Sequence, residues 1–131
     1  MDKTRKPKGT PRWLTDLRMQ VVALRKERYQ LETNLLNPPE MTAGTINTQY
    51  RTCGKANCKC MNKKNPVKHG PYHYRVEPSG KKILQTYLKD ESLIRKLKNY
   101  QRYYHWQLAY KKTQQEILDR FQEIRDKQSD A

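Results

Sequence analysis

Three thiols and an imidazole that can bind a metal lie close together in the middle of the chain. Cys53, Cys58 and Cys60 are followed by His69 in the pattern C-x4-C-x-C-x8-H. In an extended segment, the C-x-C spacing would turn the last two sulfurs to one side. Three thiolates and one imidazole make the donor set of a closed, tetrahedral zinc site. The sequence therefore predicts one Zn²⁺ bound by these four residues.

The fourth ligand and the metal each leave an alternative. His73 is the other histidine of this segment, but it falls in a predicted strand between Tyr72 and Tyr74, where a histidine is usually part of a hairpin face. An iron–sulfur cluster would use the same cysteines. Three reduced cysteines without a metal are disfavoured, because cysteine is usually buried and this lysine-rich segment offers no core. His69 and zinc are therefore the favoured ligand and metal.

The positive charge of the chain is concentrated around the cysteines. The formal net charge is +15, and residues 45–89 alone carry +9 because Glu77 is their lone acidic residue. Such a segment attracts polyanions, nucleic acid first and acidic membrane surfaces second. Because Glu77 leaves this field almost unopposed, nucleic acid is the expected partner, with DNA ahead of RNA. No membrane partner is expected, and no apolar stretch approaches the length of a membrane span. The predicted phosphate contacts are Arg51, Lys55, Lys59, Lys63, Lys64, Lys68, Arg75, Lys81 and Lys82.

The same segment lacks the groups on which most enzymes depend. A single carboxylate cannot supply paired acid–base chemistry or a magnesium site. A zinc ion with four protein ligands has no open position for a reacting water molecule. The sequence therefore predicts a protein that is not an enzyme, although an open site would arise if His69 were not a ligand.

Composition limits the size of the hydrophobic core and indicates the cellular compartment. Only 34% of the residues are hydrophobic and 31% are charged, so the fold is expected to need a metal, a partner or long helix packing. An odd number of cysteines, without an apolar leader segment, argues against a disulfide framework. A reducing, cytoplasmic environment is the expectation.

Periodicity and turn residues predict an α+β fold in four parts. Residues 1–9 form a basic, disordered arm, and residues 10–37 an amphipathic helix that starts near Thr10 and Pro11. Residues 44–89 form the metal-binding β-module, with strands expected at 45–52, 72–77 and 82–88, the last two as a hairpin. Residues 90–128 form a long helix that Asp90 caps.

The two helices are expected to bury their apolar stripes on each other or on a second copy. The first stripe has coiled-coil-like spacing with Arg28 as its charged interruption, and polar residues of both stripes, such as Arg28 and Gln114, would limit the register. The first stripe consists of Leu14, Leu17, Val21, Leu24, Arg28, Leu31 and Leu35, and the second of Leu93, Leu97, Tyr100, Tyr104, Gln107, Tyr110, Gln114, Ile117, Phe121 and Ile124. A helical hairpin within one chain and a bundle in a homodimer are both compatible with this pattern. Tyr50, Tyr72 and Tyr74 could stack on exposed bases if the target is single-stranded, but packing on the adjacent helix is the favoured expectation.

The metal segment also resembles an uncharacterised family of small proteins that are carried largely by mobile genetic elements, near transposases and recombinases. The family pattern is approximately R-Y-R-x-C-G-K-x-N-C-x-C followed by H-G-P-Y, a short hairpin and a helix. The resemblance covers roughly residues 41–105, and it departs from the family at residues 49–52, which are less basic here. It implies a metal site and a mobile-element setting but no mechanism. The matching residues are Cys53, Gly54, Lys55, Asn57, Cys58, Cys60, His69, Gly70, Pro71 and Tyr72.

Three functions follow as hypotheses. The favoured one is a zinc-containing, ribbon-like accessory protein of a mobile element that binds nucleic acid, with DNA as the expected target. The second is a helical adaptor for a recombinase, transposase or polymerase, with the zinc module as its docking element. The third is RNA binding. Salt-sensitive affinity for duplex DNA favours the first, and a preference for single-stranded RNA favours the third.

Overall fold

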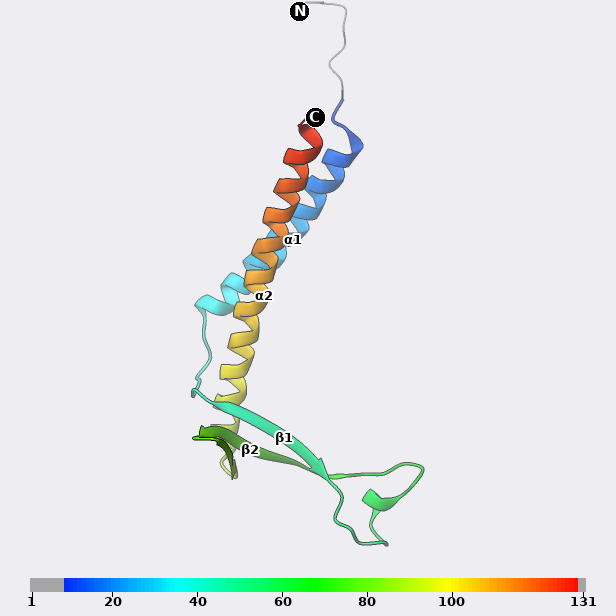
Figure 1. Cartoon of the computed structure of the whole chain (residues 1–131), viewed down its shortest axis with the longest axis vertical. Helices are drawn as coiled ribbons and strands as arrows, with labels where there is room; N and C mark the ends of the chain where they lie inside the picture. The colour runs from blue at the N-terminus through cyan, green and yellow to red at the C-terminus, as the bar shows by residue number, and fades with distance from the viewer. Residues whose placement is uncertain (1–8, 130–131) are drawn as a thin grey trace, which may run out of the picture. The chain divides into compact units, whose positions relative to one another are not determined.

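A computed structural model describes residues 9–129, so the predicted basic arm lies, except for its last residue, outside the described part of the chain. The model contains two helices and a three-stranded antiparallel sheet (Figure 1), which confirms the α+β class. The elements are α1 (Arg12–Leu36), β1 (Thr45–Arg51), the short 3₁₀ turn η1 (Lys59–Met61), β2 (His69–Ser79), β3 (Lys82–Tyr87) and α2 (Glu91–Gln128). Within residues 9–129, neither helix is apolar over enough of its length to cross a bilayer.

The two helices begin in different ways. Pro11 precedes α1, and its carbonyl oxygen accepts hydrogen bonds from the amides of Leu14 and Thr15, while no side chain caps this end. The helix therefore starts one residue after the position that the sequence predicted for proline. Asp90 caps α2 as predicted, because its Oδ1 accepts a hydrogen bond of 2.9 Å from the amide of Ser92.

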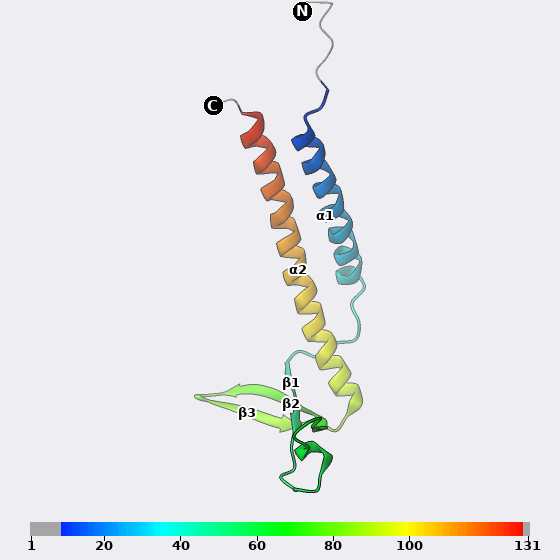
Figure 2. The ribbon, with the colours of Figure 1, turned by 90° about the vertical axis from the view of Figure 1, so that its right-hand side faces the viewer.

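Residues 9–37 and 105–129 form a compact helical unit, in which α1 lies beside the C-terminal part of α2 (Figures 1 and 2). Side-chain hydrogen bonds join the helices, among them Arg28 to Gln114 at 2.8 Å, Tyr110 to Glu32 at 2.9 Å and Arg120 to Gln20 at 2.6 Å. From one hydrogen bond to the next, the residue number rises on α2 while it falls on α1, so the two helices are antiparallel. The helical hairpin that the sequence allowed is therefore present within one chain.

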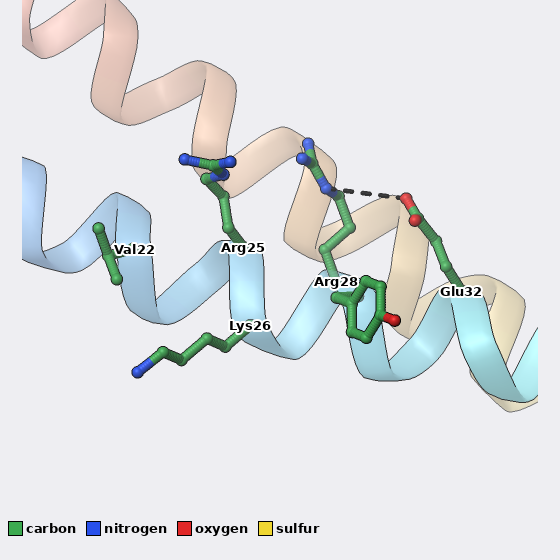
Figure 3. Close-up of a pocket in the computed structure, with 6 residues that line it drawn as sticks. Val22, Arg25, Lys26, Arg28 and Glu32 are labelled. Atoms are coloured by element: carbon green, nitrogen blue, oxygen red, sulfur yellow. Dashed lines mark ion pairs between the residues drawn. The ribbon is translucent and has the colours of Figure 1, made fainter.

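Polar groups lie inside the seam between these helices. Arg28 also forms an ion pair of 3.8 Å with Glu32, one turn further along α1 (Figure 3). The hydrogen bond to Glu32, together with partial burial, raises the pKa of Tyr110. Arg28, which the sequence predicted as a polar residue of the seam, is thus bound by the carboxylate of Glu32 and the side-chain amide of Gln114.

The buried positions of the helical unit differ partly from the predicted stripe. Leu17, Val21 and Leu31 of α1 are buried as expected, and so is Ile117 of α2. Thr113 is also buried but was not predicted. Phe121, an aromatic position of the predicted stripe, is largely exposed instead, since the stripe of a straight helix drifts away from a strict heptad spacing.

The second compact unit comprises residues 38–104, and its sheet has the order β1-β2-β3 with both pairs antiparallel. The observed β2 begins at His69, three residues before the predicted start, because His69 pairs with Arg51 across a register irregularity in β1. One face of the sheet packs on the first turns of α2. Its core consists of Ile46, Leu88 and Leu97, with Leu93 and Ile94 beside them.

The tyrosines do not pack on α2, which corrects the expectation from the sequence. Ile46 faces α2 and pairs with Arg75 of β2, so Arg75 lies on the α2 side of the sheet. His73 is two residues before Arg75 in the same strand and therefore lies on that side as well. Tyr74 must then point to the other face, because neighbouring residues of a strand alternate in direction. There it pairs with Tyr87 of β3. The cross-strand register, which is not visible in one strand, decided this orientation.

Candidate metal centre

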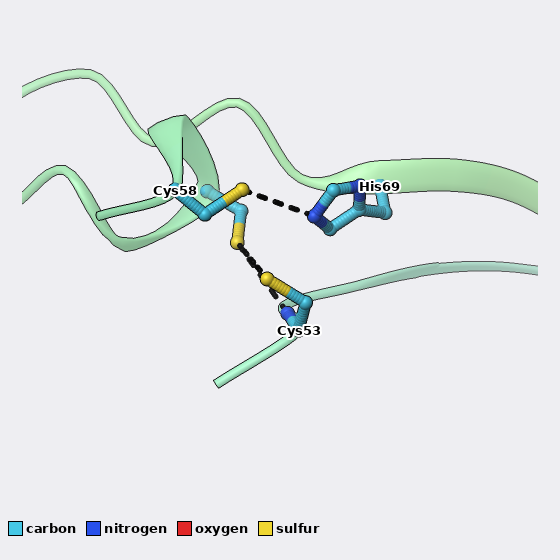
Figure 4. A group of neighbouring side chains, drawn as sticks. Cys53, Cys58 and His69 are labelled. Carbon is cyan, nitrogen blue, oxygen red and sulfur yellow. Dashed lines mark hydrogen bonds between the residues drawn. The ribbon is translucent and has the colours of Figure 1, made fainter. Parts of the chain in front are cut away.

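The four predicted ligands come together at the end of the sheet where β1 leads into the loop of residues 52–68, called here the basic loop. Cys53 lies two residues after the end of β1, Cys58 precedes η1, and Cys60 lies within η1. His69 is the first residue of β2. Because Arg51 and His69 are paired, the two ends of the basic loop are held close to each other. The labelled side chains of Cys53, Cys58 and His69 point toward a common centre (Figure 4).

The four donor atoms have the spacing that a tetrahedral metal site needs. All of them lie within 4.8 Å of one another. Cys53 Sγ is 3.5 Å from Cys60 Sγ, and Cys58 Sγ is 3.2 Å from His69 Nε2. With metal–sulfur bonds of about 2.3 Å, tetrahedral ligand atoms stand roughly 3.8 Å apart. The group can therefore hold a metal ion with only small movements of its side chains.

A tight turn, and not an extended segment, brings the two sulfurs of the C-x-C motif together. Cys58 has extended backbone angles, but residues Lys59–Met61 form the 3₁₀ turn. The amide of Met61 donates to the carbonyl of Cys58 at 3.0 Å. Cys60 is thereby turned inward, to an exposed fraction of only 2%. The expectation of an extended C-x-C segment was wrong, because the turn satisfies backbone groups that an unpaired extended loop would leave open.

Hydrogen bonds within the cluster set the ionisation of the thiols. The backbone amide of Cys60, followed by the side chains of Cys60 and Cys53, lowers the pKa of Cys58 to about 6, against the effect of burial. For Cys60, the amide of Cys53 lowers the pKa, but burial and the neighbouring sulfurs outweigh it and raise the pKa. One sulfur of the cluster is thus a thiolate near neutral pH, and thiolate is the form that binds metals.

The structure separates the two histidines that the sequence left as alternatives. His69 belongs to the sulfur cluster, whereas His73 is not part of it and makes a 2.9 Å hydrogen bond to Thr48. Partial burial and the charge of Lys98 lower the pKa of His73. The geometry therefore supports His69 as the fourth ligand and gives His73 a role within the sheet.

Gly70, next to His69, allows β1 and β2 to stay paired at the end of the sheet where His69 joins the cluster. Gly70 has φ of +136°, and a Cβ atom there would lie 2.9 Å from the carbonyl oxygen of Gln49. We expect Gly70→Ala to destabilise this end of the sheet by about 1–3 kcal/mol and to displace His69, since both the backbone angle and the contact are unfavourable. Metal affinity measured against a competing chelator should fall together with the resistance to unfolding.

Gly80→Ala is the matched control for this substitution. Gly80 also has a positive φ, +61°, but no atom lies within 4 Å of its would-be Cβ, and it occupies the turn between β2 and β3. Its replacement should cost about 1–2 kcal/mol for the left-handed backbone and leave metal affinity unchanged. Equal metal affinity in both variants would show that the Gly70 contact does not position His69.

The predicted phosphate contacts fall into two groups. The lysines of the basic loop, which are Lys55, Lys59, Lys63, Lys64 and Lys68, are all exposed, as are Arg51 at the end of β1 and Lys81 and Lys82 at the hairpin turn. Arg75 differs, because its guanidinium is half-buried, donates to the carbonyl of Ala43 at 3.1 Å and lies 2.9 Å from the carboxylate of Glu77. It is already engaged in holding the sheet unit.

The sequence had marked Tyr72 and Tyr74 as possible stacking residues, but it missed that they form an aromatic pocket with Tyr87 beside the metal cluster. A cavity of about 530 Å³ is lined by three tyrosines, two cluster residues and the end of β1. The signal that would have found it is the alternation of tyrosines in β2, combined with the register that places Tyr87 opposite Tyr74.

Comparison with known proteins finds no curated protein and no solved structure that matches this chain. A family match does exist, and it covers residues 21–99, which include all four cluster residues, the basic loop and the whole sheet. These residues are more than half of the 131-residue chain. The chain therefore belongs to the family described as domain of unknown function DUF6788.

Proposed function

We propose that this chain is a non-enzymatic, zinc-containing nucleic-acid-binding protein, with DNA as its expected target. The observation that carries the proposal is the basic loop itself. Its five lysines are exposed and stand on a segment whose two ends and middle converge on the four-residue metal cluster. Lysines on a rigid scaffold contact phosphates and give an affinity that depends steeply on salt.

The charge of the basic loop is not compensated by its neighbours. The loop contains no acidic residue, and Glu77, the lone acid of residues 45–89, is bound by Arg75. In the part of the chain that the structure describes, no ion pair involves a lysine of the loop. The field of these lysines therefore extends into solvent, where it can attract a polyanion.

The donor set supports zinc and a structural role for it. Three sulfurs and one imidazole nitrogen at tetrahedral spacing are typical of structural zinc sites. Zinc bound there would supply a cross-link between the ends and the middle of the basic loop. All four positions would be filled by protein, which leaves none for a substrate and supports a role outside catalysis.

The test is the salt dependence of DNA binding by the zinc-loaded chain. If the five loop lysines each contact one phosphate, a plot of log affinity against log salt should have a slope of about −4.5, at −0.9 per contact. Binding of a labelled duplex can be followed by fluorescence anisotropy at several salt concentrations. A wild-type chain that binds neither duplex nor single-stranded nucleic acid at low salt would refute the proposal.

The helical unit favours a second candidate, an adaptor or homodimer that associates through helices. Few residues of this unit are buried, and large apolar side chains remain exposed on its surface. Exposed apolar patches often mark sites where another protein binds. Val22 also lines a pocket on α1 whose other walls are mainly charged, namely Arg25, Lys26, Arg28 and Glu32 (Figure 3). The exposed residues are Met19, Val22, Tyr29, Leu36, Leu108, Leu118 and Phe121.

The two candidates differ in what the basic loop does. For an adaptor to a recombinase, transposase or polymerase, as the mobile-element resemblance suggests, the loop would contact protein and the salt titration would show no binding to nucleic acid. For a DNA-binding homodimer, the apolar surface joins two copies and the salt-dependent binding remains. The lysines of the basic loop are exposed and have no acidic partners among the described residues, which favours the DNA-binding homodimer over the adaptor.

A further inference from the structure

The aromatic pocket next to the metal cluster is not used by the proposed phosphate contacts. Its walls are Tyr72 and Tyr74 of β2, Tyr87 of β3 and Arg51 at the end of β1, and it reaches Cys53 and His69 of the cluster. Its volume of about 530 Å³ lies in the range of roughly 300–1,000 Å³ that small-ligand sites occupy. The pocket is therefore large enough for a flat ring system.

The rings of this pocket are arranged for contact with another aromatic group. The ring of Tyr87 is near both other tyrosines, with ring centroids 6.4 Å from Tyr72 and 5.6 Å from Tyr74, and the planes are tilted by 55° and 58°. Tyr87 is 48% exposed, although aromatic side chains generally gain free energy when they are covered. The rings thus leave one aromatic wall open to solvent.

The positive charge of the pocket determines whether its aromatic walls suit a cationic or an anionic ligand. Such walls attract organic cations in some proteins. Here the Arg51 guanidinium already lies 5.2 Å from the centroid of Tyr74 and donates to Gln49 at 2.6 Å, so a second cation would be repelled. The site suits a planar ring that carries a negative group, and a nucleotide has both.

We propose that this pocket binds an unpaired base of a nucleic-acid strand, whose neighbouring phosphates contact Arg51 and the basic loop. This inference rests on the proposed function and specifies the form of the nucleic acid. A base within a duplex is stacked on both faces, so it cannot enter the pocket, whereas a single strand offers its bases freely. The first loop lysine, Lys55, follows Arg51 by four residues, so the positive surface continues from the pocket along the chain.

The test compares two single strands that have the same phosphates and differ only in their bases. One is an ordinary DNA oligonucleotide, and the other is an abasic strand of equal length. The wild-type, zinc-loaded chain should bind the ordinary strand about tenfold more tightly, which is the order of effect that base–aromatic stacking produces. Tyr87→Leu should remove this preference, and Tyr87→Phe, which keeps the ring, should retain it.

Tyr50→Leu provides the matched control. Tyr50 is also exposed and on the sheet, but it does not line the pocket, and its replacement should leave the preference unchanged. Equal affinity of the wild-type chain for the ordinary and the abasic strand would overturn the pocket proposal. Binding of both strands with a steep salt dependence would then leave the proposed function intact, whereas binding of neither these strands nor a duplex would refute both.

Discussion

Removal of the metal is expected to release the basic loop while the helical unit stays folded. Within residues 52–68, Cys60 alone is buried and Cys58 is half-buried, so no apolar core holds this segment. The loop lacks paired strands, and ordering each of its residues costs about 1–2 kcal/mol of conformational free energy. Site formation and folding are coupled in such small metal modules, so chelation should make the loop mobile.

The expected result is specific to one part of the chain. Hydrogen exchange at residues 52–68 should accelerate after exhaustive chelation, and the affinity for DNA should fall with it. The helical unit has its own buried residues, Leu17, Val21, Leu31, Thr113 and Ile117, so the helical circular dichroism signal should change little. Metal analysis of the purified chain should give one zinc per molecule.

Two histidines supply a matched pair for the same prediction. His69→Ala removes a cluster residue, and we expect zinc affinity to fall more than about 100-fold, because even an outer partner of a ligand is worth 10–100-fold. His73→Ala removes the hydrogen bond to Thr48 and should leave zinc affinity nearly unchanged. Cys58→Ser should resemble His69→Ala. A chelated chain with an ordered basic loop and full DNA affinity would contradict the role given to the metal.

Charge reversal in the basic loop is expected to have the other large effect. In a variant that carries Lys59→Glu, Lys63→Glu and Lys64→Glu, three exposed cations are lost. The salt slope should become shallower by about 2.7, which corresponds to a loss of affinity of roughly 500-fold at 0.1 M salt. Titration of a labelled duplex at several salt concentrations measures both quantities.

The control places the same change of charge elsewhere on the surface. Lys26, Lys111 and Lys112 are exposed on the helices of the helical unit, and their replacement by Glu gives an equal net charge. If the basic loop is the phosphate-contacting surface, this second variant should lose less than about tenfold, since only long-range attraction is weakened. Equal losses in the two variants would mean that net charge, and not the basic loop, accounts for binding.

The sequence by itself determined the groups that carry the chemistry. Thiols, imidazoles and lysines are recognisable without a fold, and their spacing placed Cys53, Cys58, Cys60 and His69 within reach of one ion. Helix positions also followed from local signals, because the cap at Asp90 and the apolar period of each helix act over a few residues. The predicted fold class followed from these elements.

Tertiary structure alone decided which faces and which partners these groups have. The pairing of Ile46 with Arg75 places His73 on the α2 side of the sheet and directs the tyrosines of β2 to the other side. The pairing of Tyr74 with Tyr87 then closes an aromatic pocket from two strands. A strand presents alternate residues to opposite faces, and only contact with distant segments determines which face is covered, so this information is not local to any one motif.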